Sequence, residues 1–269
     1  MRALLTAAAL LAFAANSLLC RLALREGAAD PAGFTALRLG SGAAVLLLAA
    51  RGRLGGSWAG AAALLVYAVG FSFAYVRLPA GTGALILFGS VQGTMLVAGY
   101  RAGERPRPVQ WLGFLLALAG LAGLTLPGAS APTLGAAASM ATAGVAWGLY
   151  SLLGRGASDP TADTAGNFVR SCAPLVLLLV LAAPALSVTP RGAVLAATSG
   201  ALTSGLGYVA WYAAVRRLSR TQAAIVQLAV PVLAAWGGVA LLGEVWTGRL
   251  VACGAAVLAG VALGFLTGR

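Results

Sequence analysis

The chain has 269 residues, of which 60% are hydrophobic and 9% are charged. Soluble domains carry about 25% charged residues, so this composition excludes a soluble globular protein and predicts one that is embedded in membrane lipids. The net charge of +12 comes from 18 arginines in small groups between apolar runs, a pattern that sets membrane topology and forms no nucleic-acid-binding face.

Apolar stretches follow one another along the chain, and a membrane-spanning helix needs about 20 such residues. The stretch 108–154 contains two spans, because the segment 127–132 begins and ends with proline and favours a turn. The run 39–50 is long enough only if its helix begins near Ala32 and includes Arg38. The charge-free stretches that hold the other spans are 3–20, 54–76, 78–100, 171–190, 192–215, 221–243 and 250–268.

The second half of the chain repeats the first half in pattern. Gly103-Glu104 returns as Gly243-Glu244, 140 residues later. Ser17–Arg21 returns as Ser151–Arg155, so the first span belongs to the repeated fold even though it imitates a signal peptide. The sequence therefore predicts an all-α polytopic membrane protein with ten transmembrane helices in two repeats.

The two repeats are expected to be inverted with respect to each other. Residues 1–126 form the first five-helix unit, residues 134–269 form the second, and 127–133 is a linker. Because five is odd, two joined units must enter the membrane in opposite senses, an arrangement typical of transporters. With the N-terminus inside, eleven arginines fall in cytoplasmic segments and five in outer segments. This bias predicts that both termini lie in the cytoplasm, and we expect a multi-pass protein of the bacterial inner membrane.

Several short motifs, taken in order, resemble a known group of transporters. They are Ala15-Asn16-Ser17 with Arg21, Phe34–Leu39, Leu78–Leu85, Gly103–Pro106 and Gly243-Glu244. In order and duplication they resemble the drug/metabolite transporter superfamily, specifically EamA-type exporters and, among these, the YddG-type aromatic amino-acid exporters. The resemblance implies export of small metabolites, often amino acids, through a central cavity between the halves. We expect no cofactor.

Aromatic residues recur at helical spacing in the third and eighth spans. Tyr67, Phe71 and Tyr75 are four residues apart and share one helix face. That face lines the cavity or belongs to an aromatic belt against lipid, and Tyr75, near the outer boundary, is a gate candidate. The same alternatives hold for Tyr208 and Trp211 in the eighth span.

Polar and aromatic residues of four other spans complete the candidate substrate site. An amide in mid-membrane rarely faces lipid, so those of Gln92 and Gln227 either join helices or contact substrate. Pro231 is expected to kink the ninth span. The remaining candidates are Asn16, Phe88, Trp147 and Tyr150. By the resemblance to EamA-type exporters, Trp147 matches the tryptophan that this family has in the second repeat.

Two arginines lie inside spans. Arg38 is about seven residues, or about 10 Å, inside the second span, and Arg170 occupies the matching place in the seventh. Either each side chain snorkels and pairs with a nearby carboxylate, Asp30 for one and Asp159 or Asp163 for the other, or it forms a substrate-carboxylate or gate contact.

The six acidic residues lie in loops or at helix ends. Glu104 and Glu244 have the position of N-cap residues for the helices that follow them. Since a proton-coupling carboxylate belongs in mid-membrane, we expect facilitated transport or exchange. The absence of histidine and of clustered carboxylates predicts no bound metal and argues against a membrane-embedded enzyme.

The sequence thus favours a transporter that works by alternating access, and not an enzyme. Its partners are membrane lipids and a small-molecule substrate, with amino acids favoured and nucleosides or drugs as the alternative. A homodimer is possible, because the Gly260–Gly264 pair in the last span packs either within the chain or against a second copy.

Overall fold

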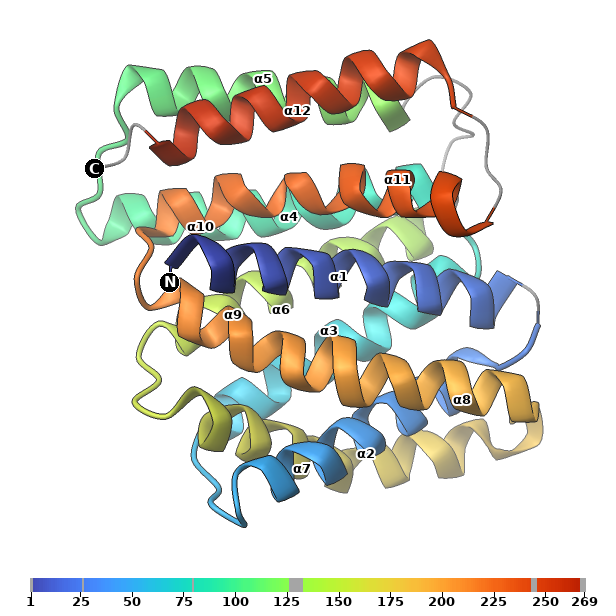
Figure 1. Cartoon of the computed structure of the whole chain (residues 1–269). Coiled ribbons are helices and arrows are strands. Elements are labelled where there is room, and N and C mark those ends of the chain that lie inside the picture. The colour runs from blue at the N-terminus through green and yellow to red at the C-terminus, as the bar shows by residue number, and fades with distance from the viewer. Residues whose placement is uncertain (1, 26, 79, 126–132, 243–245, 267–269) are drawn as a thin grey trace.

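The computed structural model describes residues 2–25, 27–78, 80–125, 133–242 and 246–266. Nine of the described helices are long and apolar enough to cross a membrane, and the shorter apolar helix Pro108–Leu124 is the tenth. The prediction of an all-α fold with ten spans is confirmed. In Figure 1, α1 begins and α12 ends at the same end of the helix bundle, as an even number of crossings requires.

The helices of the first half are α1 (Arg2–Arg25), α2 (Pro31–Ala49), α3 (Trp58–Tyr75), α4 (Ala80–Arg101) and α5 (Pro108–Thr125). Those of the second half are α6 (Leu134–Gly154), α7 (Pro160–Ala182) with the short η1 (Ala183–Ala185), α8 (Pro190–Thr198), η2 (Ser199–Leu206), α9 (Gly207–Val215), α10 (Arg220–Gln227), α11 (Ala229–Leu242) and α12 (Gly248–Leu266). As expected, α7 begins before Arg170.

The second helix of each half begins with the same local structure. Asp30 caps α2 by accepting hydrogen bonds from the amides of Ala32 and Gly33, both at 2.9 Å. Asp159 caps α7 by accepting from the amides two and three residues further along, both at 3.1 Å. A proline follows each cap, where its fixed φ suits the first helical position.

These matched caps fix how α2 and α7 align. One turn in, the hydroxyls of Thr35 and Thr164 each donate to the carbonyl of the proline four residues earlier, at 2.7 Å. The offset between the two helices is therefore 129 residues, and the place of Arg38 is taken by Asn167 in the second half. The pairing of Arg38 with Arg170 was wrong by three residues, almost one helical turn.

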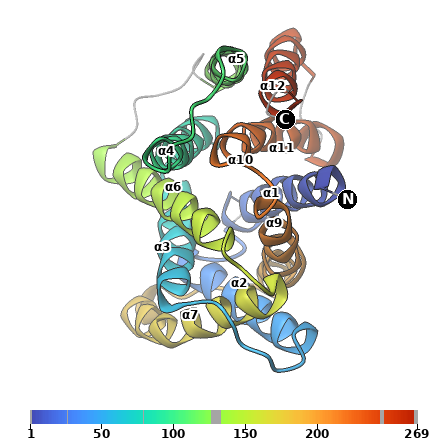
Figure 2. The ribbon, with the colours of Figure 1, turned by 90° about the vertical axis from the view of Figure 1, so that its left-hand side faces the viewer.

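The two halves pack against each other reciprocally. The first helix of one half, α6, packs on the third and fourth helices of the other, α3 and α4, and α1 packs likewise on α9 and α11. Figure 2 shows the result as two facing walls, the α6 wall (α3, α4, α6) and the α1 wall (α1, α9, α10, α11). The pairs α5–α12 and α2–α7 close the bundle above and below.

Small residues hold the α5–α12 pair together. A Cβ added at Gly113 of α5 would lie 2.5 Å from the carbonyl oxygen of Gly260 in α12 and 2.7 Å from the amide of Gly264. Such close backbone approach requires glycine. Of the two roles open to the Gly260–Gly264 pair, the structure therefore selects packing within the chain.

Two spans of the second half depart from regular α-helix. The span α8–η2–α9 has 26 residues against 18 in its counterpart α3, and its middle, Ser199–Leu206, is a π-helix. The next span is interrupted between Gln227 and Ala229. Pro231 has no N–H to donate to the carbonyl of Gln227, four residues earlier, so the expected break occurs there.

Candidate substrate site between the two repeats

Trp147 of α6 lies at the centre of an aromatic cluster between the two walls. Its ring centroid is 5.1 Å from that of Phe13, 4.8 Å from that of Tyr208 and 4.9 Å from that of Tyr67. The stacked ring of Tyr150 is 5.5 Å away. All five side chains are less than a tenth exposed, so in this conformation the walls meet through direct ring contacts.

Trp147 is also tied to a buried amide. Its indole Nε1 donates to Oε1 of Gln227, at the end of α10, over 2.6 Å. The Nε2 of that amide donates to the carbonyl of Ala223 at 2.9 Å and to the sulfur of Met95 on α4 at 3.3 Å. Gln227 therefore joins α4, α6 and α10 in this conformation, which is the helix-joining alternative for its amide.

Arg38 of α2 borders the cluster and is completely buried. Its Nε donates to Ser204 at 2.8 Å and its Nη2 to Tyr208 at 2.6 Å and Tyr67 at 3.5 Å, all hydroxyl groups. The guanidinium carbon lies 5.4 Å from the ring centroid of Tyr67 and 5.9 Å from that of Phe71, which adds cation–π attraction.

The expected ion partner of Arg38 is engaged elsewhere. Asp30 caps its own helix and accepts from the amide of Ser187 at 2.9 Å. Among the described residues, no carboxylate lies within ion-pair distance of Arg38. Of the two alternatives for Arg38, snorkelling towards Asp30 was wrong, because the hydroxyls of α3, η2 and α9 hold its guanidinium inside the bundle.

Asn16 connects α1 to the π-helix and, through it, to Arg38. The Asn16 side chain is buried. Its Oδ1 accepts hydrogen bonds from three hydroxyls of η2, those of Ser199 at 2.6 Å, Thr203 at 3.4 Å and Ser204 at 3.3 Å. Ser204 is shared with Arg38, so one continuous polar network runs from α1 through η2 to α2.

Hydrogen bonds made by side chains of the second half join three of its helices, α6, α7 and α9. The indole of Trp211 donates to the hydroxyl of Ser151 on α6 at 2.9 Å. The hydroxyl of Tyr212 accepts from Asn167 at 3.3 Å and donates to the carbonyl of Tyr150 at 3.2 Å. These contacts join α9 of the α1 wall to α6 of the α6 wall and also to α7.

Phe88 and Gln92 of α4 are also buried, but no ring contact joins Phe88 to the cluster in the described residues. Gln92 is 1% exposed, and neither its Oε1 nor its Nε2 has a hydrogen-bond partner within the described part of the chain. A buried amide without partners is costly, so Gln92 is the candidate amide with the most free hydrogen-bonding capacity.

The two remaining gate candidates lie further out. Tyr75 extends the aromatic face of α3, with its ring centroid 4.7 Å from that of Phe71. Arg170 donates to the carbonyl of Gly55 at 2.6 Å and lies 5.8 Å from the ring centroid of Trp58. It thus points to the α2–α3 loop, away from the cluster.

The carboxylates expected to pair with Arg170 bind other groups. Asp159 forms an ion pair with Arg53 at 2.7 Å, and Asp163 accepts from the amide of Gly56 at 2.9 Å. Arg170 is half-buried and reaches the loop at the end of the bundle. The snorkelling geometry therefore fits Arg170, but the predicted ion partners were wrong.

Glu104 caps a helix of the other half. Its carboxylate accepts from the backbone amides of Arg220 and Thr221 at 3.0 and 3.1 Å and forms an ion pair with the Arg220 side chain at 3.1 Å. Burial alone would raise the pKa of Glu104, but these hydrogen bonds outweigh it and lower the pKa below its usual value. We expected Glu104 to cap α5; it caps α10 instead. Glu244 lies outside the described residues.

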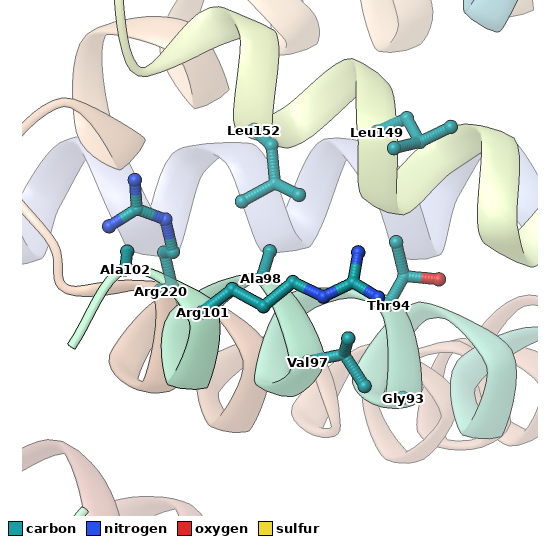
Figure 3. Close-up of a pocket in the computed structure, with 9 residues that line it drawn as sticks. All are labelled: Gly93, Thr94, Val97, Ala98, Arg101, Ala102, Leu149, Leu152 and Arg220. Atoms are coloured by element: carbon teal, nitrogen blue, oxygen red, sulfur yellow. The ribbon is translucent and has the colours of Figure 1, made fainter. Parts of the chain in front are cut away.

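A surface groove of about 690 Å³ runs between α4 and α6 at the same end of the bundle. Figure 3 shows that Arg101 extends along α4 towards Thr94, while Leu149 and Leu152 of α6 cover the opposite side. Arg220 lies at one end of the groove, next to Ala102. None of the cluster side chains lines this groove.

The sequence reasoning missed Phe13, Ser199, Thr203 and Ser204. Phe13 had a signal, because the 134-residue offset that pairs Ser17 with Ser151 also pairs Phe13 with Trp147. The hydroxyls of η2 had none, since their approach to Asn16 depends on the π-helix.

Three comparisons relate the chain to known proteins. A family model described as the EamA-like transporter family matches residues 134–266. The uncharacterized protein PA1977 of Pseudomonas aeruginosa is 56% identical over 266 residues, or 97% of this chain and 93% of that protein. A solved crystal structure has a TM-score of 0.80 and 25% sequence identity, over 97% of this chain and 99% of that chain.

Proposed function

The chain belongs to the EamA-like transporter family and is a multi-pass membrane transporter of small molecules, and we propose that it exports small metabolites, amino acids in particular. Export proceeds by alternating access: the α1 wall and the α6 wall separate at one end of the bundle at a time. The substrate then binds in the space that the aromatic cluster fills in the present conformation.

The position of the cluster carries this proposal. Transporters built from inverted repeats bind substrate near the middle of the membrane, between the repeats and beside interrupted helices. Trp147 has such surroundings. Phe13 and Tyr67 of the first half and Tyr208 of the second half contact its ring. Gln227, at the break of the α10–α11 span, accepts its indole hydrogen bond. Aromatic faces and a few amides suit a small, partly apolar metabolite.

The contact of Glu104 with the start of α10 supports a gate at one end. It joins α4 of the α6 wall to α10 of the α1 wall. With both termini in the cytoplasm, as the arginine distribution favours, this is the cytoplasmic end, and the contact breaks when substrate enters. A C-terminal fusion to a reporter active only in the periplasm should be silent; an active fusion would contradict this orientation in the inner membrane.

We infer transport down the substrate gradient. All the described carboxylates lie at helix ends: Asp30, Glu104, Asp159 and Asp163. A proton relay through the membrane needs carboxylates within the spans. Proteoliposomes with an imposed proton gradient test this. The proposal expects equilibration of substrate without accumulation, and accumulation against its gradient would contradict it.

Efflux from intact cells tests the proposed substrate class. Cells that lack their own amino-acid exporters are loaded with dipeptides that release single amino acids. The protein should restore growth and speed efflux for at least one neutral or aromatic amino acid. If the protein rescues only cells that are challenged with nucleosides or drugs, the substrate class is one of these and not amino acids. If the protein transports no solute of the panel, export is contradicted.

A further inference from the structure

Arg38 is a cation held inside the membrane-spanning bundle by neutral groups alone. The side chain is fully buried, and its three hydrogen-bond partners are the hydroxyls of Tyr67, Ser204 and Tyr208. Its Nη1 is buried and has no hydrogen-bond partner among the described residues. A charge in this position is costly unless an anion compensates it, and the described chain supplies none.

The second repeat shows that the structural part of this role needs no charge. Asn167 takes the place of Arg38 in the register set by the matched N-caps. Its amide also binds a tyrosine of α9, Tyr212, at 3.3 Å, and it accepts from the amide of Ser57 at 3.0 Å. A neutral amide is therefore sufficient to join these helices, and the positive charge of Arg38 requires a separate explanation.

The surroundings of Arg38 are those of a binding site. It lies about 10 Å from the start of α2, and its guanidinium lies over two rings of α3, those of Tyr67 in the aromatic cluster and of Phe71 one turn further along. The hydroxyl of Ser204 accepts a hydrogen bond from Nε of Arg38, and Ser204 belongs to the π-helix η2. In proteins, π-helical segments occur frequently at functional sites. The free Nη1 lies next to Nη2, so the end of the guanidinium can present two donors to one anion.

We propose that Arg38 binds the anionic group of the transported solute, so that the substrates of this protein carry a carboxylate. The assignment rests on the proposed transport function for its biological use, but the binding itself does not require transport. A carboxylate takes both terminal nitrogens in a bidentate contact. Tyr208, on the α1 wall, gives up its hydrogen bond from Nη2 as the walls separate, and the aromatic cluster receives the remainder of the solute.

Pairs of solutes that differ only in the anionic group test the proposal. The probes are phenylacetate with phenylacetamide and phenylalanine with phenylalaninamide. Their binding to the purified full-length protein in detergent is measured by the rise in melting temperature. The wild type should bind each carboxylate at least tenfold more tightly than its amide. Equal binding within the pairs, or no rise with either carboxylate, overturns the proposal.

Three variants separate the charge from the fold. Arg38→Gln should lose the tenfold preference and Arg38→Lys should keep part of it, because lysine retains the charge without the fork. Arg170→Gln, which removes a charge that faces the α2–α3 loop, should keep the full preference. A folded Arg38→Gln protein with unchanged preference contradicts the proposal. If Arg38→Gln does not fold, the wild-type pairs and Arg38→Lys still decide.

Transport of the same pairs distinguishes the two levels of the account. If binding prefers carboxylates but proteoliposomes move none of the four solutes, the carboxylate site stands and amino-acid transport fails for this panel. If an amide is carried as fast as its carboxylate partner, transport stands and the role of Arg38 in substrate selection fails.

Discussion

The hydrogen bond between Trp147 and Gln227 gives the most specific prediction of stability. Trp147→Phe keeps an aromatic ring in the cluster but removes the indole N–H that donates to Gln227 over 2.6 Å. The acceptor is completely buried, so water cannot replace the lost donor in this conformation. The variant therefore leaves a buried carbonyl without a partner and a small space beside Phe13 and Tyr208.

Two scales bound the size of the effect. Leaving a buried group unsatisfied costs about 1–3 kcal/mol in soluble proteins. Side-chain hydrogen bonds between membrane helices average about 0.6 kcal/mol in double-mutant cycles and reach about 1.7 kcal/mol. Because this bond is short and lies away from lipid, we expect Trp147→Phe to lower the free energy of unfolding by about 1–2 kcal/mol. The coupling to Gln227→Leu should be about 1 kcal/mol, since the double variant removes both polar partners.

Equilibrium unfolding in mixed detergent micelles measures this cycle. The matched control is Trp111→Phe, combined with Gln227→Leu, because Trp111 lies on α5 with 44% of its surface exposed. The free-energy changes of substitutions at independent sites add within about 0.3–0.5 kcal/mol. The two substitutions of the control cycle should add within the same limit. A Trp147–Gln227 coupling within that limit would refute the reasoning, since the bond would then make no measurable difference to the fold.

Two further predictions concern the ends and the periphery of the bundle. The pKa of Glu104 is lowered in the folded protein, so its contribution is complete above the usual value of 4.5 and is lost as pH falls through the lowered pKa. Glu104→Gln should therefore destabilise the protein by about 1 kcal/mol at pH 7, a small figure because the site is partly exposed, and the difference should vanish in acid; melting curves across pH would contradict this if the difference did not depend on pH. Gly113→Leu should force α5 and α12 apart where Gly113 meets Gly260 and cost about 1–3 kcal/mol by overpacking, whereas Leu112→Ala on the exposed face should change the melting temperature little; equal melting temperatures for both variants would contradict the packing.

Hydropathy and repetition together predicted the spans, because each depends only on residue type and order. The charge of Arg38 or Arg170 did not prevent helix formation, since the apolar residues around each were sufficient. The register between halves was less accessible. The Asp30-Pro31 and Asp159-Pro160 pairs indicate the correct register in the sequence, but the two arginines inside the spans suggested a different pairing. Only the cap hydrogen bonds decided between the two registers.

Contacts between distant segments could not be predicted from local signals. Glu104 precedes α5 and has the residue type of an N-cap, yet its carboxylate lies against α10, which is over a hundred residues later. The hydroxyl of Ser204 reaches Asn16 and Arg38 only because η2 is a π-helix, a conformation that the sequence of this span did not indicate. Cross-repeat geometry is thus the part that required the structure.

Flux through proteoliposomes tests the central claim, that the buried cluster between the repeats is the substrate site of an amino-acid transporter. Counterflow of labelled neutral and aromatic amino acids is compared among wild type, Trp147→Ala and Trp111→Ala, at equal amounts of reconstituted protein. The account predicts flux in the wild type, at least a tenfold loss in Trp147→Ala and normal flux in Trp111→Ala. Equal flux through Trp147→Ala and wild type would contradict it.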